Sequence, residues 1–390
     1  MKKIAVITKN TTFNKSYGGL EVHTKALVDL LSEDYIIDIF APKRDLKNSE
    51  VTEGNKNFYF LDVEYRTGYF SDFQKNKWNQ GLYNFFKDKF LENKYDLIIS
   101  ISSAGYPLLR KKNEFDCQFL TISHGTALSE YKSILNETRG LSLSLLKNTP
   151  YFLYNYFFKQ REFINLSDYV ICVSDYVKEN LIKETLCKNV SKFQTIFNGA
   201  AIDETYEKNF DINGELKIII SGRVEVSKGI FVLLEAIKNL QVKLYVAGEG
   251  NALLEAKKFV IDNKLSDKVE FLGKLTFDNL KYYYKESDVL VVPSLRVEGF
   301  PMSIIEGMSY YLPVIASKIG GNRDAVLESK TGFLIEPGDV KDLEEKLGYF
   351  NKYPEKIKEF GINSRNLVIQ RFSIKGMIKE YKDVIKRLIK

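Results

Sequence analysis

Short apolar runs alternate with amphipathic stretches along nearly the whole chain. The first pair is KKIAVIT at residues 2–8 and LEVHTKALVDLLSE at residues 20–33. The apolar runs are rich in Ile and Val and lack polar alternation, which is typical of parallel strands that are buried on both faces. Because these strands alternate with helical patterns, the sequence predicts βαβ units and an α/β fold.

The pattern starts again after a polar, turn-rich stretch, NGAAIDETYEKNFDINGE, at residues 198–215. A strand pattern at 216–222 and a helix pattern at 229–240 follow it. We therefore expect two Rossmann-like domains facing each other across a cleft, comprising residues 1–203 and residues 204–373. Ligands of such sheets bind at the carboxyl ends of the strands, so the candidate residues are those that follow the predicted strands.

The segment VLVVPSLRVEGFPMSIIEG, at residues 289–307, places two glutamates around a predicted helix start. Pro301 suits the first helical position, and the amides of Met302 and Ser303 would then form an anion-binding helix end. Glu298 on the loop and Glu306 one turn into the helix could each accept hydrogen bonds from paired hydroxyls. Glu298, the helix end and Glu306 would thus match the hexose, the diphosphate and the ribose of a nucleotide sugar. The alternative is a polar turn with two surface glutamates.

A second strand end carries two cations in SGRVEVSKGI, at residues 221–230. Arg223 and Lys228 could together neutralise a diphosphate. A solvated basic loop is the alternative. Gly222 and Gly248 also follow strands, where a glycine lets a ligand approach the backbone closely. They could equally be plain turn glycines.

In the first domain, Gly18 and Gly19 precede a helix without the GxGxxG spacing of a dinucleotide site. The protein has only two histidines, His23 in this helix and His124 directly after a strand pattern. Both fall at predicted cleft positions, although a structural role is possible for each.

Composition narrows the class of protein. The chain has 390 residues, 44% apolar and 28% charged, with a net charge of +6. This mild basic surplus, without a basic stripe, argues against a nucleic-acid binder. Three scattered cysteines provide neither a disulfide framework nor a zinc site. No apolar run is long enough to span a bilayer and no signal peptide is evident, so we expect a cytoplasmic protein.

Together these segments resemble the retaining glycosyltransferases of family 4, which have the GT-B fold. The main match is the E-x7-E pattern from Glu298 to Glu306, flanked by ESDVLVVPS and by LPVIASKIGGNRDAV and TGFLIEP. SGRVEVSKGI, AGEG, FNGAAID, SDYVICVS and YGGLEVH, which precede this pattern in the chain, also fall in family order. The resemblance covers nearly the whole chain, and it implies that residues 374–390 return to the N-terminal domain.

The resemblance implies a role for each matching residue. Glu298 would bind donor-sugar hydroxyls and Glu306 the ribose, while Arg223 and Lys228 would stabilise the diphosphate leaving group. The segment Phe300, Pro301, Met302, Ser303 would hold sugar and phosphate. In the first domain, Gly19 would contact the diphosphate, His124 would lie beside the hexose, and His23 is assigned to the acceptor side.

This sequence departs from the family pattern at two positions. Pro301 stands in place of glycine, and Gly307 stands in place of alanine, which should only weaken the helix slightly.

The expected reaction is transfer of a hexose or N-acetylhexosamine, with a UDP-sugar favoured, to a glycan or lipid-linked acceptor. No cofactor or metal is expected, because no Asp-x-Asp cluster is placed at the diphosphate. The aromatic and basic stretch LLKNTPYFLYNYFFKQREF, at residues 145–163, suits the cytoplasmic face of an inner membrane or, alternatively, core packing. Bacterial surface polysaccharide synthesis is the leading biological role. The rival functions are a nucleotide-sugar epimerase or hydrolase of the same fold and a non-catalytic nucleotide-sugar-binding subunit.

Overall fold

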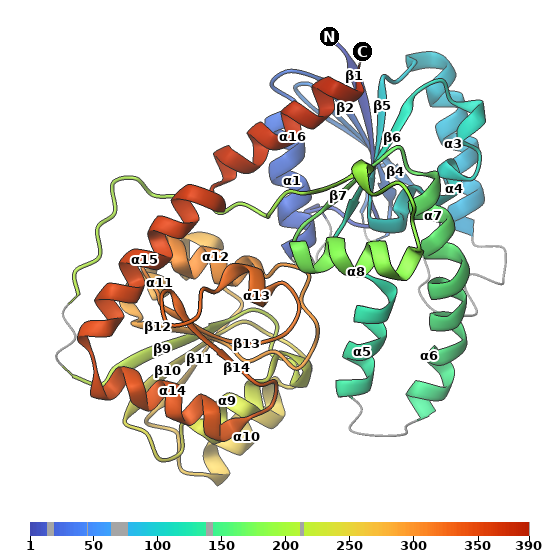
Figure 1. Cartoon of the computed structure of the whole chain (residues 1–390). Helices are drawn as coiled ribbons and strands as arrows, with labels where there is room; N and C mark the ends of the chain where they lie inside the picture. The colour runs from blue at the N-terminus through green and yellow to red at the C-terminus, as the bar shows by residue number, and fades with distance from the viewer. Residues whose placement is uncertain (14–18, 45, 64–76, 138–142, 211–213, 390) are drawn as a thin grey trace. The chain divides into compact units, whose positions relative to one another are not determined.

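The computed structural model describes the chain except for residues 14–18, 45, 64–76, 138–142, 211–213 and 390. It forms two compact units (Figure 1). Unit 1 comprises residues 1–131, 141–197 and 377–390, and unit 2 comprises residues 132–140 and 198–376. Each unit is built around its own sheet, so the predicted α/β fold with two parallel-sheet domains is confirmed.

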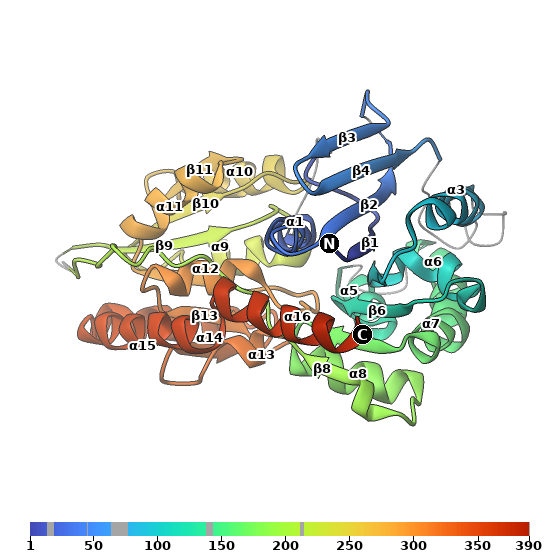
Figure 2. The same cartoon turned by 90° about the horizontal axis from the view of Figure 1, so that it is seen from above.

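Unit 1 contains a sheet with the strand order β3-β4-β2-β1-β5-β6-β7-β8. All neighbours pair in parallel except β3, which lies antiparallel to β4 at one edge (Figure 2). The strands are β1 (Lys3–Ile7), β2 (Ile36–Pro42), β3 (Glu50–Glu53), β4 (Lys56–Leu61), β5 (Leu97–Ile101), β6 (Gln118–Ser123), β7 (Tyr169–Cys172) and β8 (Phe193–Thr195). The α-helices are α1 (Gly19–Leu31), α3 (Lys77–Asn93), α4 (Tyr106–Leu109), α5 (Ala127–Glu137), α6 (Leu143–Tyr154), α7 (Gln160–Leu166) and α8 (Asp175–Thr185), and a π-helical turn, η3 (Asn155–Lys159), joins α6 to α7.

The central strands of unit 1 are apolar because both faces of the sheet are covered. Every residue of β5 is buried, and β1 is buried from its second residue onward. This explains why the strand patterns in the sequence lack polar alternation.

Unit 2 contains a parallel sheet with the strand order β11-β10-β9-β12-β13-β14. The strands are β9 (Leu216–Ser221), β10 (Val242–Ala247), β11 (Val269–Gly273), β12 (Val289–Val292), β13 (Val314–Ser317) and β14 (Gly332–Ile335). The helices are α9 (Ile230–Ala236), α10 (Leu253–Asp262), α11 (Phe277–Glu286), α12 (Met302–Ser309), α13 (Asn322–Ala325), α14 (Val340–Lys352) and α15 (Glu355–Arg371), with a short 3-10 turn, η5 (Val226–Lys228), before α9. Helices α9, α10 and α14 cover one face, and α11, α12 and α13 the other (Figure 1).

The order of the strands reverses between β9 and β12, which are hydrogen-bonded neighbours although 67 residues separate the end of one from the start of the other (Ser221 and Val289). Such a reversal leaves a crevice at the carboxyl ends of the two strands, where open α/β sheets bind their ligands.

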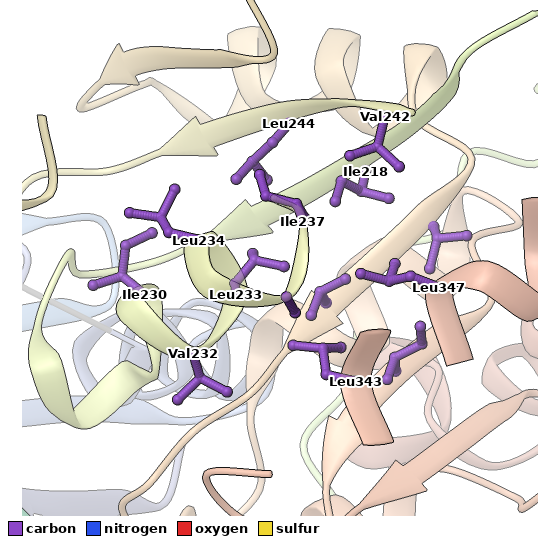
Figure 3. Packing of buried hydrophobic residues seen from close by; sticks show 14 of the residues in the cluster. Ile218, Ile230, Val232, Leu233, Leu234, Ile237, Val242, Leu244, Leu343 and Leu347 are labelled. Carbon is purple, nitrogen blue, oxygen red and sulfur yellow. The ribbon is translucent and has the colours of Figure 1, made fainter. Parts of the chain in front are cut away.

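The hydrophobic core of unit 2 lies between the sheet and helices α9, α10 and α14. Leu233 of α9 and Ile237, which caps that helix, pack with Ile218 and Leu244 of the sheet (Figure 3). Leu343 of α14 belongs to the same cluster and is fully buried. Residues of β9 and β10 are buried in this cluster, so the loops that follow these strands start from the packed core.

Helix α16 (Ile374–Leu388) joins the two units. Its buried residues include Tyr381 and Val384, and Lys382 forms a salt bridge of 2.8 Å with Asp34 in the turn that follows α1. From residue 377 onward this helix is therefore part of unit 1. Across the described portion of the chain, none of the helices combines the length and the apolar character that crossing a membrane would require.

Candidate active site

The loop between β12 and α12 carries most of the candidate residues of unit 2. Helix α12 begins at Met302, one residue later than predicted, because Pro301 adopts an extended backbone with φ −75° and ψ 121° and caps the helix instead of entering it. The amides of Met302 and Ser303 nevertheless lie in the first helical turn, where no intrahelical acceptor is available. They therefore remain suited to binding an anion.

The backbone of this loop is fixed by two glycines after β13. The Gly321 amide donates to the Glu298 carbonyl at 2.8 Å. A Cβ at Gly320 would lie 2.1 Å from that carbonyl oxygen, and one at Gly321 would lie 2.0 Å from the oxygen of Gly299. In the sequence this stretch stands out only as a family match; the Gly-Gly pair shortly after the strand is the signal of its packing role.

A second attachment reaches the loop from the start of unit 2. The Asn198 side chain is buried and donates to the Phe300 carbonyl at 3.1 Å, and the Phe300 ring contacts Phe372 at 5.2 Å. The adjacent Ala200 amide donates to the Phe372 carbonyl at 2.8 Å. Sequence patterns predict no role for Asn198 or Phe372, because their contacts join positions far apart in the chain.

Lys228 and Glu298 form the central ion pair of the site. The Lys228 Nζ lies 2.6 Å from the Glu298 Oε1, and the Ser294 hydroxyl donates to the same oxygen at 3.2 Å. Burial alone would raise the pKa of Glu298, but the charges of Lys228 and Arg296 and the hydrogen bonds from Lys228 and Ser294 outweigh it and lower that pKa below its usual value. Glu298 is therefore ionised at neutral pH.

The ion pair is possible because β9 and β12 are neighbours at the reversal of strand order. Lys228 ends η5 after β9, and Glu298 follows β12. The Ser227 carbonyl accepts the amide of Leu295 at 2.8 Å, so the two loops are also joined through their backbones. A Cβ at Gly229 would lie 1.9 Å from the Pro293 oxygen, which shows how closely the loops approach.

Arg223 has a different environment from Lys228, although both follow β9. Its side chain is 61% exposed and its Nη1 lies 2.5 Å from the Glu225 Oε1. It is therefore placed at the same strand end but pairs with an acid of its own loop.

Gly222 and Gly248 lie at the ends of β9 and β10 with φ of 133° and 149°. A Cβ at Gly248 would lie 1.7 Å from the Gly222 oxygen, so the approach of the two strand ends requires glycine at residue 248. Gly248 is therefore more than a turn glycine, because its lack of a side chain allows this backbone contact.

Glu306 faces a different environment from Glu298. The Tyr284 hydroxyl donates to its Oε2 at 3.4 Å, and Ser221 lies 2.8 Å from that hydroxyl. Burial raises the pKa of Glu306 to about 7, an effect that the Tyr284 hydrogen bond only partly offsets. The two glutamates therefore differ in charge near neutrality, since Glu298 has a cation beside it and Glu306 has a neutral phenol.

Gly307, next to Glu306, has a packing role that its helix propensity does not reveal. A Cβ there would lie 2.7 Å from the Leu290 Cδ2, and Leu290 is fully buried in β12. The expectation that alanine would differ only through helix propensity is therefore corrected, because α12 packs directly on the strand at this position.

The candidate residues of unit 1 form a separate group. Gly19 is the exposed first residue of α1, whereas Gly18 lies outside the described residues. The His23 and His124 rings are 5.1 Å apart at 78°, and His23 also lies 6.0 Å from the Tyr381 ring of α16. His23 is only 2% exposed, so in this conformation it contacts the core of unit 1.

Both histidines are neutral at physiological pH. Burial lowers the pKa of His23 to about 4, and burial together with His23 lowers that of His124. A neutral imidazole can both donate and accept a hydrogen bond, which suits contact with a sugar hydroxyl. Within the described part of the chain, both ring nitrogens of His23 and the Nε2 of His124 are buried without a hydrogen-bond partner.

The chain has two parallel-sheet α/β units, and the second has a cation, two carboxylates and a helix end on the segments that follow its strands. Residues 17–204 match the model of "Glycosyltransferase Family 4", and residues 202–367 match that of "Glycosyl transferases group 1". The chain therefore belongs to the family 4 glycosyltransferases, which have the GT-B fold.

Similar proteins include glycosyltransferases of several kinds. An uncharacterized glycosyltransferase of Methanocaldococcus jannaschii is 34% identical over 59% of this chain and 63% of its own length, so the match spans less than two thirds of that relative. The capsular polysaccharide biosynthesis glycosyltransferase CapM of Staphylococcus aureus is 27% identical over 65% of this chain and 70% of that protein.

Solved structures show the same fold over the whole chain. Sucrose-phosphate synthase of Thermosynechococcus elongatus has a TM-score of 0.81 at 22% identity, covering 100% of this chain and 99% of that one. HepE of Anabaena, solved in complex with UDP-glucose, has a TM-score of 0.72 at 16% identity and covers 100% of both chains.

The raised pKa of Glu306 predicts a specific pH dependence of stability. A carboxyl group with a folded-state pKa of about 7 makes the folded protein lose stability as pH rises from its unfolded value of 4.5 to about 7. Glu306→Gln removes this loss. We expect the stability of Glu306→Gln relative to wild type to increase by about 1–3 kcal/mol between pH 5 and pH 8, measured by urea unfolding.

Glu298→Gln is the matched control for this experiment. The pKa of Glu298 is lowered, so its stabilising charge is already present at pH 5 and is lost only at lower pH. The effect of Glu298→Gln should therefore be the same at pH 5 and pH 8. If Glu306→Gln also shows no difference between these pH values, the raised pKa is wrong.

Proposed function

We propose that this glycosyltransferase moves a hexose or N-acetylhexosamine from a nucleotide sugar to a glycan or lipid-linked acceptor, with retention of anomeric configuration. The observation that carries the proposal is the 2.6 Å contact between Lys228 and Glu298. The reaction breaks the bond between the sugar and the diphosphate. It needs a cation next to the phosphate and a carboxylate next to the sugar hydroxyls. This pair supplies both groups at a single point of the crevice.

The remaining residues extend the donor site on either side of that point. The first-turn amides of α12 follow Glu298 and would bind the diphosphate together with Lys228. Glu306 lies one turn further along the helix, where its carboxylate would accept hydrogen bonds from the ribose hydroxyls. Arg223 is exposed on the neighbouring loop and would reach the diphosphate after exchanging its partner Glu225.

The chemistry follows from where charge develops. Breaking the anomeric bond leaves negative charge on the nucleoside diphosphate, beside the Lys228 ammonium. A preorganised group of this kind contributes roughly 3 kcal/mol to lowering the barrier. Glu298 accepts hydrogen bonds from sugar hydroxyls and stabilises the positive charge that develops on the ring. In unit 1, the neutral His124 would donate to or accept from a hydroxyl of the transferred sugar.

A UDP-sugar is the favoured donor, and surface polysaccharide synthesis is the favoured role. HepE binds UDP-glucose, and CapM acts in capsular polysaccharide biosynthesis. Metal independence is part of the proposal, because Lys228, Arg223 and the helix end already supply positive charge at the diphosphate.

The test is a panel of UDP-, GDP- and ADP-sugars assayed for release of the nucleoside diphosphate, with a lipid-linked glycan mixture as acceptor. Lys228→Ala should lower kcat by about 100- to 1,000-fold while weakening donor affinity much less, because Lys228 meets more charge in the transition state. Lys238→Ala is the control, since Lys238 pairs with Glu235 on the surface at 2.8 Å.

The same assay separates the proposal from its rivals. Release that needs no acceptor would indicate a hydrolase, and donor binding without any release would indicate a binding subunit. Turnover should persist in EDTA; if chelation abolishes it and Mg²⁺ restores it, the metal-independent mechanism is wrong. A Lys228→Ala enzyme with normal kcat would contradict the assignment of the leaving-group cation.

The acceptor half of the proposal includes a membrane surface. Leu153, Phe157 and Phe158, on α6 and η3, are each 44–65% exposed although they are large and apolar. The Arg161 guanidinium lies 5.4 Å from the Phe157 ring, so a cation borders the apolar surface. Such a surface suits the headgroup boundary of an anionic bilayer, where a lipid-linked acceptor resides.

Co-sedimentation with vesicles tests this part alone. The double variant Phe157→Ser and Phe158→Ser should lose binding to vesicles that contain anionic lipid, because insertion of the two rings is lost. Leu254→Ser and Ile261→Ser together form the control, since these two residues are also exposed apolar positions but lie on α10. Equal binding by both double variants and the wild type would contradict the membrane surface.

A further inference from the structure

Unit 1 contains a buried carboxylate that the proposed mechanism does not use. Glu184 lies in the last turn of α8 and is 4% exposed. It accepts hydrogen bonds from the Thr126 hydroxyl at 2.5 Å, the Gln160 side-chain amide at 2.9 Å and the Leu128 backbone amide at 3.3 Å. All three donors are neutral groups, so the network holds a carboxylate without a salt bridge among them.

The network lies at the start of helix α5. The Gln160 side-chain oxygen accepts the Ala127 amide at 2.7 Å, and Glu184 accepts the next amide, that of Leu128. These first-turn amides have no acceptor within the helix, and a negative charge is favourable at a helix N-terminus. Two side chains that are remote in sequence therefore fix where α5 begins.

The turn that enters α5 is the one that carries His124. Strand β6 ends at Ser123, whose hydroxyl donates to the Gly125 carbonyl at 2.9 Å. Thr126 follows, and its hydroxyl donates to Glu184 while accepting the Ser129 amide at 3.2 Å. His124 therefore lies between the end of a strand and the capped start of a helix. Hydrogen bonds hold the turn on both sides of it.

We propose that Glu184, together with Gln160, is a positioning residue for His124. The carboxylate holds the start of α5, and the turn holds the imidazole in one orientation against His23. This inference rests on the proposed function, in which His124 lies beside the transferred sugar. A buried carboxylate costs more desolvation than a neutral cap, and a network with all its partners satisfied gives a more rigid turn in return.

The His124 signal in an NMR spectrum tests the geometry without any substrate. The chain has two histidines, so a protein labelled with ¹³C at histidine gives one set of imidazole C–H signals for each, and His23→Gln assigns the two sets. Glu184→Ala should shift and broaden the His124 signal, and Glu184→Gln should restore part of the wild-type position because one acceptor oxygen remains. Thr126→Val removes a single donor and serves as a second variant if Glu184→Ala does not fold.

Asp168→Asn is the matched control. Asp168 also accepts a backbone amide, that of Phe119 at 2.8 Å, but at the opposite end of β6 from His124. Asp168→Asn and Glu184→Ala should both lower the melting temperature of the protein. Asp168→Asn should leave the His124 signal at its wild-type position. An unchanged His124 signal in both Glu184→Ala and Thr126→Val would overturn the positioning role.

Kinetics then connect the geometry with turnover. Glu184→Ala should lower kcat by about 10- to 100-fold, the size expected when a reacting geometry is misplaced, with partial recovery in Glu184→Gln and none of this loss in Asp168→Asn. A displaced His124 signal with unchanged kcat would overturn the functional part of the inference. A wild-type protein that turns over no nucleotide sugar contradicts the proposed function instead, and the NMR result then decides the positioning geometry by itself.

Discussion

The ion pair between Lys228 and Glu298 is the interaction on which the organisation of the donor site depends. Its two residues are 70 positions apart in the chain and meet because β9 and β12 are neighbours where the strand order reverses. The pair lowers the pKa of Glu298 and keeps it charged despite burial. The pair also places a cation and a carboxylate next to each other. A site that breaks a sugar–phosphate bond needs a cation for the phosphate and an acceptor for the sugar hydroxyls.

The surrounding backbone is built to keep this pair in place. The Gly321 amide binds the Glu298 carbonyl, Asn198 binds the Phe300 carbonyl, and Ser227 accepts the amide of Leu295. Glycines at the contact points allow backbone to approach backbone at distances that any Cβ would prevent. The loop is therefore preorganised, and ligand binding need not order it first.

The sequence predicted an α/β fold with two parallel-sheet units, because buried parallel strands leave continuous apolar runs. It also placed Lys228 and Glu298 correctly at strand ends. It could not predict that they would pair, since pairing depends on the order of the strands in the sheet.

Other contacts between distant parts of the chain could not be predicted either. The roles of Asn198 and Phe372 depend on such contacts. Gly307 was judged from helix propensity alone, and its contact with Leu290 depends on how α12 packs on β12. The burial of His23 similarly depends on Tyr381, which lies more than 350 residues later in the chain.

The most direct test of the account is calorimetric titration of Glu298→Gln with two ligands, the nucleoside diphosphate and the matching nucleotide sugar. Removing the charge of Glu298 frees Lys228 for the phosphate, so the diphosphate should bind at least as tightly as to the wild type, by up to about fivefold more. The nucleotide sugar should bind more weakly, because its sugar hydroxyls lose a charged acceptor. Opposite responses of the two ligands would support a cation and a carboxylate that serve the two sides of one bond. Equal weakening of both ligands, or no change in either, would contradict it.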